Sequence, residues 1–121
     1  MRVFALRGAI SVGRNDATEI HEATATLMRE IMERNALGPR NVISCLFTAT
    51  EDLNAEFPAA AARTLGFEEV PLLCAREMAV PGAMPRVIRV LIHYHAEEGH
   101  RAKHVYLREA GALRSDLQAA Q

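Results

Sequence analysis

The sequence predicts one α/β (α+β) domain, a mixed β-sheet packed on one long helix plus a short helix. Strand-like segments stand on both sides of a single long stretch with helical periodicity, and Pro and Gly residues separate them. The 121 residues are enough for one hydrophobic core. We therefore expect a single domain over residues 1–121, with a flexible tail from about residue 115.

Residues 2–12 alternate in the manner of a strand. Phe4, Leu6 and Ile10 fall on one face, whereas Arg7 lies on the other face between small side chains. The room beside this long cation has to be filled by a neighbouring element, another chain or a ligand.

The one long helix is expected from Asp16 to about Asn35. Asp16 and Glu19 form a capping-box-like start, and apolar residues follow at helical spacing. We expect Gly38 to cap the C-terminal end and Pro39 to prevent continuation.

The remaining segments are expected to be strands, apart from one short helix. Residues 41–50 are β-branched and apolar on both faces, as in an interior strand. Pro58 begins the short helix and Gly66 closes it. Further strands are predicted over residues 68–74, 86–95 and 104–114, the last as one strand or a pair of short ones. Because one main helix covers only one face of this sheet, the other face and the edges invite oligomerisation.

Composition and charge narrow the function. The chain is 50% hydrophobic and 24% charged, as is typical of a compact soluble protein. Its net charge of -1 provides no positive field for a polyanion, so we expect no nucleic acid partner. No apolar run reaches the ~18 residues of a membrane span, and the N-terminus lacks the apolar region of a signal peptide. Cys45 and Cys74 have no disulfide-framework spacing, so a cytoplasmic location is expected.

Arginine dominates the basic residues, and thirteen of the fourteen are Arg. Base composition alone accounts for such a bias, but arginine also binds carboxylates bidentately. Four arginines fall at strand faces or element ends, as a pocket for a dianionic substrate would require: Arg7, Arg63, Arg89 and Arg114. Taken alone, Arg89 is better explained by a solvent face that it shares with His93 and His95, and the other arginines weaken that interpretation.

A run of histidines, and Cys74 with Glu77, are two further candidate sites. His93, His95, His100 and His104 form an H-x-H-x4-H-x3-H run. Apart from Glu97 and Glu98, which are expected to be exposed, no Cys, Asp or Glu in the run is placed to complete a tetrahedral metal site, which favours solvated histidines.

Cys74 has no partner histidine at fixed spacing, so a nucleophilic role is not favoured. Together with Glu77 it could hold a substrate hydroxyl, although Glu77 also fits an ordinary surface carboxylate. The chain contains no P-loop, GxGxxG, nucleophile elbow or HExxH motif.

Six segments in order resemble the monofunctional chorismate mutases of the small trimeric α/β-barrel class. They are LRGA with Arg7, TATEDLNAEFPAAAAR with Phe57 and Arg63, VPLLCAREMAVPG with Cys74 and Glu77, RVIRV with Arg89, HVYL with Tyr106, and ALRSDL with Leu113 and Arg114. Each motif is weak alone, but together they cover almost the whole chain at family-like spacing.

The resemblance implies an isomerase of the shikimate pathway that converts chorismate to prephenate for Phe and Tyr biosynthesis. This Claisen rearrangement within one molecule uses no cofactor. It requires that the substrate is held folded and that a fixed cation meets the negative charge developing on the breaking ether oxygen. The resemblance also implies a homotrimer, a pseudo-α/β barrel with each site between adjacent subunits, and no membrane partner.

By resemblance, Arg89 is that cation, while Arg7 and Tyr106 bind the enolpyruvyl carboxylate and Cys74 with Glu77 holds the ring hydroxyl. The other substrate-binding residues implied are the apolar Phe57, Leu73 and Leu113 and the mobile cations Arg63 and Arg114. One departure is Ala60, where family members commonly carry a lysine.

Three alternatives remain open at this point. They are a non-catalytic trimeric module that binds a small carboxylic acid, a histidine-based metal protein, and an enamine or imine deaminase of the other small trimeric α/β-barrel group. Loss of chorismate on addition of pure protein, metal analysis and ammonia release would distinguish them.

Overall fold

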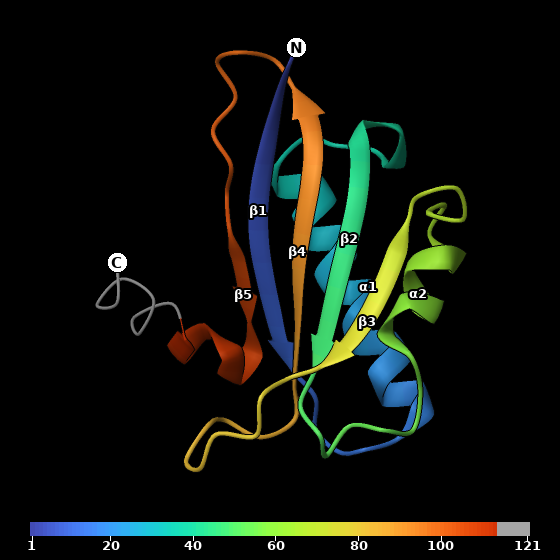
Figure 1. Cartoon of the computed structure of the whole chain (residues 1–121), viewed down its shortest axis with the longest axis vertical. Helices are drawn as coiled ribbons and strands as arrows, with labels where there is room; N and C mark the ends of the chain where they lie inside the picture. Colours follow the sequence, from blue (N-terminus) through green and yellow to red (C-terminus); the bar gives the residue numbers. More distant parts are fainter. Residues whose placement is uncertain (114–121) are drawn as a thin grey trace.

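A five-stranded sheet forms one layer and two helices form the other (Figure 1). The computed structural model describes residues 1–113; Arg114 and the tail expected from about residue 115 lie outside the described residues. In chain order the elements, with η for a 3-10 helix, are β1 (Arg2–Ser11), α1 (Ala17–Arg34), η1 (Pro39–Asn41), β2 (Val42–Ala49), α2 (Pro58–Thr64), β3 (Leu72–Arg76), β4 (Val87–Ala96), β5 (Val105–Leu107) and η2 (Arg108–Ala112).

The sheet is mixed, as the sequence predicts, with strand order β3-β2-β4-β1-β5. Central β4 runs antiparallel to both β1 and β2, whereas the outer pairs β1–β5 and β2–β3 are parallel. The segment containing α2 connects the parallel neighbours β2 and β3, and the segment containing α1 connects β1 to β2, which run in the same direction on either side of β4. Both helices therefore lie on the same face of the sheet, behind it in Figure 1.

The core lies between α1 and the sheet, and Gly8 of β1 sets how closely they approach. A Cβ atom at Gly8 would lie 2.7 Å from Ile31 Cδ1 and 3.3 Å from Leu27 Cδ1, so any larger residue would force these side chains of α1 to shift. Leu6 and Ile10 are fully buried beside it, as their alternation predicts.

Helix α1 begins as expected and ends differently. The Asp16 carboxylate accepts a hydrogen bond from the Glu19 amide at 3.0 Å. At the other end Ala36, rather than Gly38, takes the left-handed conformation, with φ 53°, whereas Gly38 is extended. The Leu37 amide donates to the Met32 carbonyl in a Schellman-type closure, so the expected glycine cap at Gly38 is wrong.

Two strand predictions are shifted or too long. Residues 68–74 were expected to form a strand, but β3 covers Leu72–Arg76, because Phe67 to Val70 close a turn through a 3.1 Å hydrogen bond. Residues 104–114 were expected to continue as strand, but β5 ends at Leu107, and Arg108 turns into η2 with φ 57°. The segments over 41–50, 58–66 and 86–95 are confirmed within one or two residues.

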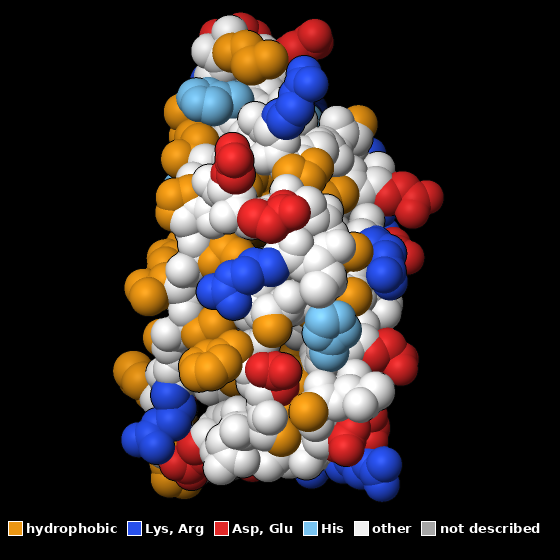
Figure 2. All heavy atoms as spheres, turned by 90° about the vertical axis from the view of Figure 1, so that its right-hand side faces the viewer, with side chains coloured by type: hydrophobic (Ala, Val, Ile, Leu, Met, Phe, Trp, Pro, Cys, Tyr) orange, Lys and Arg blue, Asp and Glu red, His pale blue; other side chains and the backbone are white. Residues whose placement is uncertain are grey.

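The face of the sheet opposite the helices carries exposed apolar side chains. Val3, Leu46 and Leu73 on this face, hereafter the open face, are 54%, 40% and 61% exposed. Figure 2 views the molecule from the side, and hydrophobic side chains protrude along the left margin of that view. No helix within residues 1–113 is both long and apolar enough to cross a membrane.

Candidate active site

A cavity of about 270 Å³ lies on the open face, over the middle of the sheet. Arg7 of β1, Arg89 of β4 and Tyr106 of β5, three residues singled out from the sequence, line it together with Leu46 and Thr48 of β2. Four neighbouring strands thus contribute to one site, because side chains of alternate residues share a face. Part of the room that the sequence indicates beside Arg7 is this cavity.

Glu77 and Arg89 form the best-defined contact of the site. Arg89 Nε donates to both Glu77 carboxylate oxygens, at 3.1 and 3.0 Å. Thr48 Oγ1 donates to Glu77 Oε2 at 2.8 Å. The Glu77 side chain is only 16% exposed and that of Arg89 is 37% exposed, so the pair is half-buried. Among the contacts described for residues 1–113, Arg89 uses only Nε, which leaves its two terminal nitrogens for a ligand.

The charge of this group favours a small anion. Arg7 and Arg89 carry two positive charges and Glu77 one negative, so the net charge is +1. The walls between them are largely apolar, with Leu46, Val90 and Leu91 lining the cavity. Apolar walls limit screening by water and strengthen the attraction for a carboxylate.

Other predicted site residues form a second group at the β3 end of the sheet. Phe57, at the start of α2, is 70% exposed, and Cys74 with Phe57 lines a separate cavity of about 380 Å³. Arg63 is exposed in the last turn of α2, and Leu73 lies exposed on the open face opposite Leu46.

Cys74 and Glu77 do not meet within one chain. Cys74 pairs with the buried Phe47 and packs against the core on the helix side of the sheet. Glu77 contacts Thr48 and Arg89 on the open side. The two side chains thus lie on different sides of the sheet, and the joint hold of Cys74, through its thiol or backbone amide, and Glu77 on one substrate hydroxyl stays a prediction.

Leu113 and Tyr106 lie at the η2 end of the open face. Both pack against a small buried cluster of Ala9, Val87 and Ala110, which η2 brings over the end of the open face. The predicted Arg114 lies outside the described residues.

Two of the histidines take part in hydrogen bonds within the described part of the chain. His100 Nε2 lies 2.7 Å from the Tyr94 hydroxyl, and His104 Nδ1 accepts from the Arg7 amide at 3.0 Å. Over residues 1–113, no three His, Cys, Asp or Glu side chains gather to hold a metal ion. Burial raises the pKa of the Cys45 thiol to about 12, and burial also raises the pKa of Tyr94.

Thr48 is the polar site residue that motif reasoning missed. It stands directly opposite Arg89 in the β2–β4 ladder. The alternation in residues 41–50 could have placed it on the face of Leu46, but both faces of that strand are apolar enough to hide which one is open.

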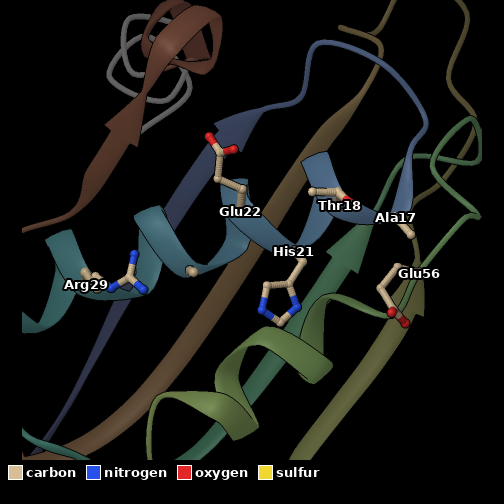
Figure 3. A pocket seen from close by; sticks show the side chains of 7 residues that line it. Ala17, Thr18, His21, Glu22, Arg29 and Glu56 are labelled. Atoms are coloured by element: carbon tan, nitrogen blue, oxygen red, sulfur yellow. The ribbon is translucent and has the colours of Figure 1, made fainter.

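A further hollow of about 540 Å³ lies along the outer side of α1 (Figure 3). Its charged side chains are of mixed sign, with His21, Glu22 and Arg29 on α1 and Glu56 on the segment before α2. None of the residues singled out from the sequence lines it, so the cavity of the open face is the candidate active site.

Comparisons with known proteins agree on one family. The model of the family described as chorismate mutase type I matches residues 3–117. Chorismate mutase AroH of Thermus thermophilus is 47% identical over 121 residues, covering 98% of this chain and 99% of that protein. Chorismate mutase AroH of Bacillus subtilis is 39% identical over 119 residues, covering 97% and 94%. A solved structure of a chorismate mutase from Clostridium thermocellum superposes with a TM-score of 0.86 at 42% identity, covering 90% of this chain and 98% of the other.

Proposed function

The chain belongs to the chorismate mutase type I family, and from this premise we propose how its residues convert chorismate to prephenate. The reaction is an isomerisation inside one molecule and forms part of aromatic amino acid biosynthesis. One carbon–oxygen bond breaks while one carbon–carbon bond forms, so no proton donor, nucleophile or cofactor has to act. Catalysis then depends on holding the folded substrate and on meeting the charge of the transition state.

Arg89 is the proposed cation for the breaking ether oxygen. Its Nε is held by Glu77, which fixes the plane of the guanidinium before the substrate arrives. The terminal nitrogens can then reach the ether oxygen and a carboxylate at the same time. A donor that is already oriented stabilises the developing charge without further reorganisation.

Arg7 and Tyr106 are proposed to bind the enolpyruvyl carboxylate, and Glu77 to accept a hydrogen bond from the ring hydroxyl. Arg7 and Tyr106 line the same cavity as Arg89. Glu77 has lone pairs beyond those used by Arg89 and Thr48, so it can accept the additional bond. Leu113 is proposed as an apolar wall of the site at its η2 end.

We infer that each complete site combines two subunits of a homotrimer. Chorismate carries two carboxylates, whereas the open-face cavity of one chain offers a net charge of only +1. Arg63, Phe57, Leu73 and Cys74 lie in the second group, at the β3 end, and are suited to complete the site of an adjacent copy. The exposed apolar open face supports such an assembly, because large apolar patches on soluble proteins usually mark interfaces.

Ala60 makes the cation from the second group more important. It lies half-buried on α2, at the position where the family resemblance implies a lysine. With no cation there, Arg63 and Arg114 are the residues proposed to supply the second positive charge.

A mixed-oligomer experiment tests the shared site. Arg89→Ala disables the first group and Arg63→Glu the second, so each variant alone is expected to be nearly inactive. Subunits of the two variants, unfolded together and refolded, should recover activity in about a quarter of the sites, because random assembly pairs two intact groups there. Light scattering measures the trimer mass.

The matched control mixes Arg89→Ala with Arg7→Ala, which damage the same group. That mixture should regain no activity above its parents. Recovery in the control, or none in the first mixture from variants that form trimers, would contradict the shared site.

The cytoplasm is our proposed location, since Cys45 and Cys74 are both free thiols and a reducing compartment keeps them so. A single domain over residues 1–121 remains a prediction.

A further inference from the structure

We propose that Thr48 is a positioning residue of this enzyme, whose hydroxyl holds Glu77 in the orientation that fixes Arg89. The inference rests on the proposed roles of Arg89 and Glu77. Thr48 is the first residue of the TATEDLNAEFPAAAAR segment, but the resemblance assigns it no role, and the geometry of the open face alone carries the proposal.

The three residues form a continuous hydrogen-bonded chain. Thr48 Oγ1 donates to Glu77 Oε2 at 2.8 Å, and Arg89 Nε donates to the same oxygen at 3.0 Å and to Oε1 at 3.1 Å. Thr48 and Arg89 are direct partners in the antiparallel β2–β4 ladder. Two rigid central strands therefore hold the Glu77 carboxylate from two directions.

Glu77 needs this second anchor because it lies just beyond the end of a strand, at the start of a loop. Its amide donates to the Ala49 carbonyl at 2.9 Å, but β3 ends at Arg76 and an irregular loop follows. Three side-chain torsions separate the Glu77 backbone from its carboxylate. Without the hydroxyl, only the flexible Arg89 side chain would orient that carboxylate, and each side chain would then depend on the other.

The hydroxyl also decides which oxygen of Glu77 is fully engaged. Oε2 accepts from both Thr48 and Arg89, whereas Oε1 accepts only from Arg89 among the described contacts of residues 1–113. Oε1 is therefore the oxygen with more capacity for the substrate hydroxyl. Thr48 thus sets both the plane of Arg89 and the free acceptor of Glu77.

The central variant is Thr48→Val, which removes the hydroxyl and keeps the β-branched shape that suits a strand. We expect kcat to fall about tenfold or more, the effect of losing one hydrogen bond to a charged group that positions a reacting centre. Thr48→Ser keeps the hydroxyl and should restore most of the lost rate. Ser44→Ala, which removes a hydroxyl on the same face of β2 farther from Glu77, is the matched control and should keep the wild-type kcat.

A double-mutant cycle with Glu77→Ala, which removes the acceptor of the Thr48 hydroxyl, tests whether Thr48 acts through Glu77. Chorismate loss is followed with excess enzyme, and thermal unfolding of each variant is recorded beside it. If Thr48 positions Glu77, the penalty of Thr48→Val should shrink to about twofold in the Glu77→Ala background. A full, additive penalty there would overturn the inference and assign Thr48 to direct substrate contact or to the strand alone.

Other outcomes are equally decisive. An unchanged kcat in Thr48→Val, or a serine variant as slow as the valine variant, would overturn the positioning role. Failure of the underlying roles has a different signature, because Arg89→Ala and Glu77→Ala would then keep nearly full activity on their own.

Discussion

Replacing Arg89 with alanine is the most direct test of the catalytic proposal. The substitution removes the donor proposed to face the ether oxygen and also breaks the contact of Nε with Glu77. Glu77 is left with Thr48 as its described side-chain partner, and the net charge contributed by Arg7 and Glu77 falls to zero.

The expected loss divides unequally between kcat and KM. One preorganised donor to a developing oxyanion contributes about 10²- to 10³-fold to kcat, or about 3–4 kcal/mol. The Arg89 side chain is 37% exposed, so water screens part of its attraction for the bound dianion, and the change in KM should be smaller. Because the interaction strengthens as the bond breaks, most of the loss belongs to kcat.

The assay follows the loss of chorismate absorbance over a range of substrate concentrations. Arg7→Ala is the comparison variant, because Arg7 is proposed to bind a carboxylate in both the ground state and the transition state. It should raise KM by about 10- to 100-fold, the effect of a charge-assisted hydrogen bond, and change kcat less. The reasoning fails if Arg89→Ala keeps kcat within about tenfold of wild type, or if both variants lose kcat and KM in the same mild proportion.

Two further predictions concern stability. Gly8→Ala should lower the free energy of unfolding by about 1–3 kcal/mol, because the added Cβ would lie 2.7 Å from Ile31 Cδ1. Urea unfolding measures this change, and an unchanged midpoint would show that the Ile31 side chain and α1 shift freely. The free energy of unfolding should also fall as the pH rises above about 9, because burial raises the pKa of the Cys45 thiol from 9.0 to about 12. Below pH 9 the thiol keeps its proton in both the folded and the unfolded chain. Between pH 9 and about 12 only the unfolded chain releases the proton, which lowers the free energy of unfolding by up to about 1.4 kcal/mol per pH unit. Cys45→Ala should remove most of this pH dependence in urea titrations between pH 8 and about 11. The raised pKa of Tyr94 contributes a smaller decrease of stability in the same direction, which the variant keeps. An equally steep decrease in the variant would refute the role of Cys45.

Local signals in the sequence predicted most of the elements. Asp16 begins α1, and Pro58 begins α2, because each has a side chain whose chemistry acts within one turn. The end of α1 could not be read in the same way. Ala36 adopts a left-handed conformation that alanine rarely takes, and tertiary packing rather than residue preference has to stabilise it.

The candidate site was only partly readable from the sequence. Alternation placed Arg7 and Arg89 on strand faces, but strand order is not local, so their meeting in one cavity was not derivable from either segment. The same limitation hid Thr48, which matters only because β2 lies beside β4. The separation of Cys74 from Glu77 was within reach of the sequence, because residues three positions apart in an extended strand point to opposite faces, but the expected strand ended at residue 74, two residues before β3 ends at Arg76.

The edges and the open face of the sheet differ in how strongly they favour aggregation of a newly synthesised subunit. The two edge strands are short, with five residues in β3 and three in β5, so they offer few free backbone groups to a passing strand from another chain. The exposed apolar surface around Leu46 and Leu73 is the region that favours association between subunits. Unassembled subunits should therefore associate through side chains rather than form cross-β fibres, and the proposed trimer would bury that surface.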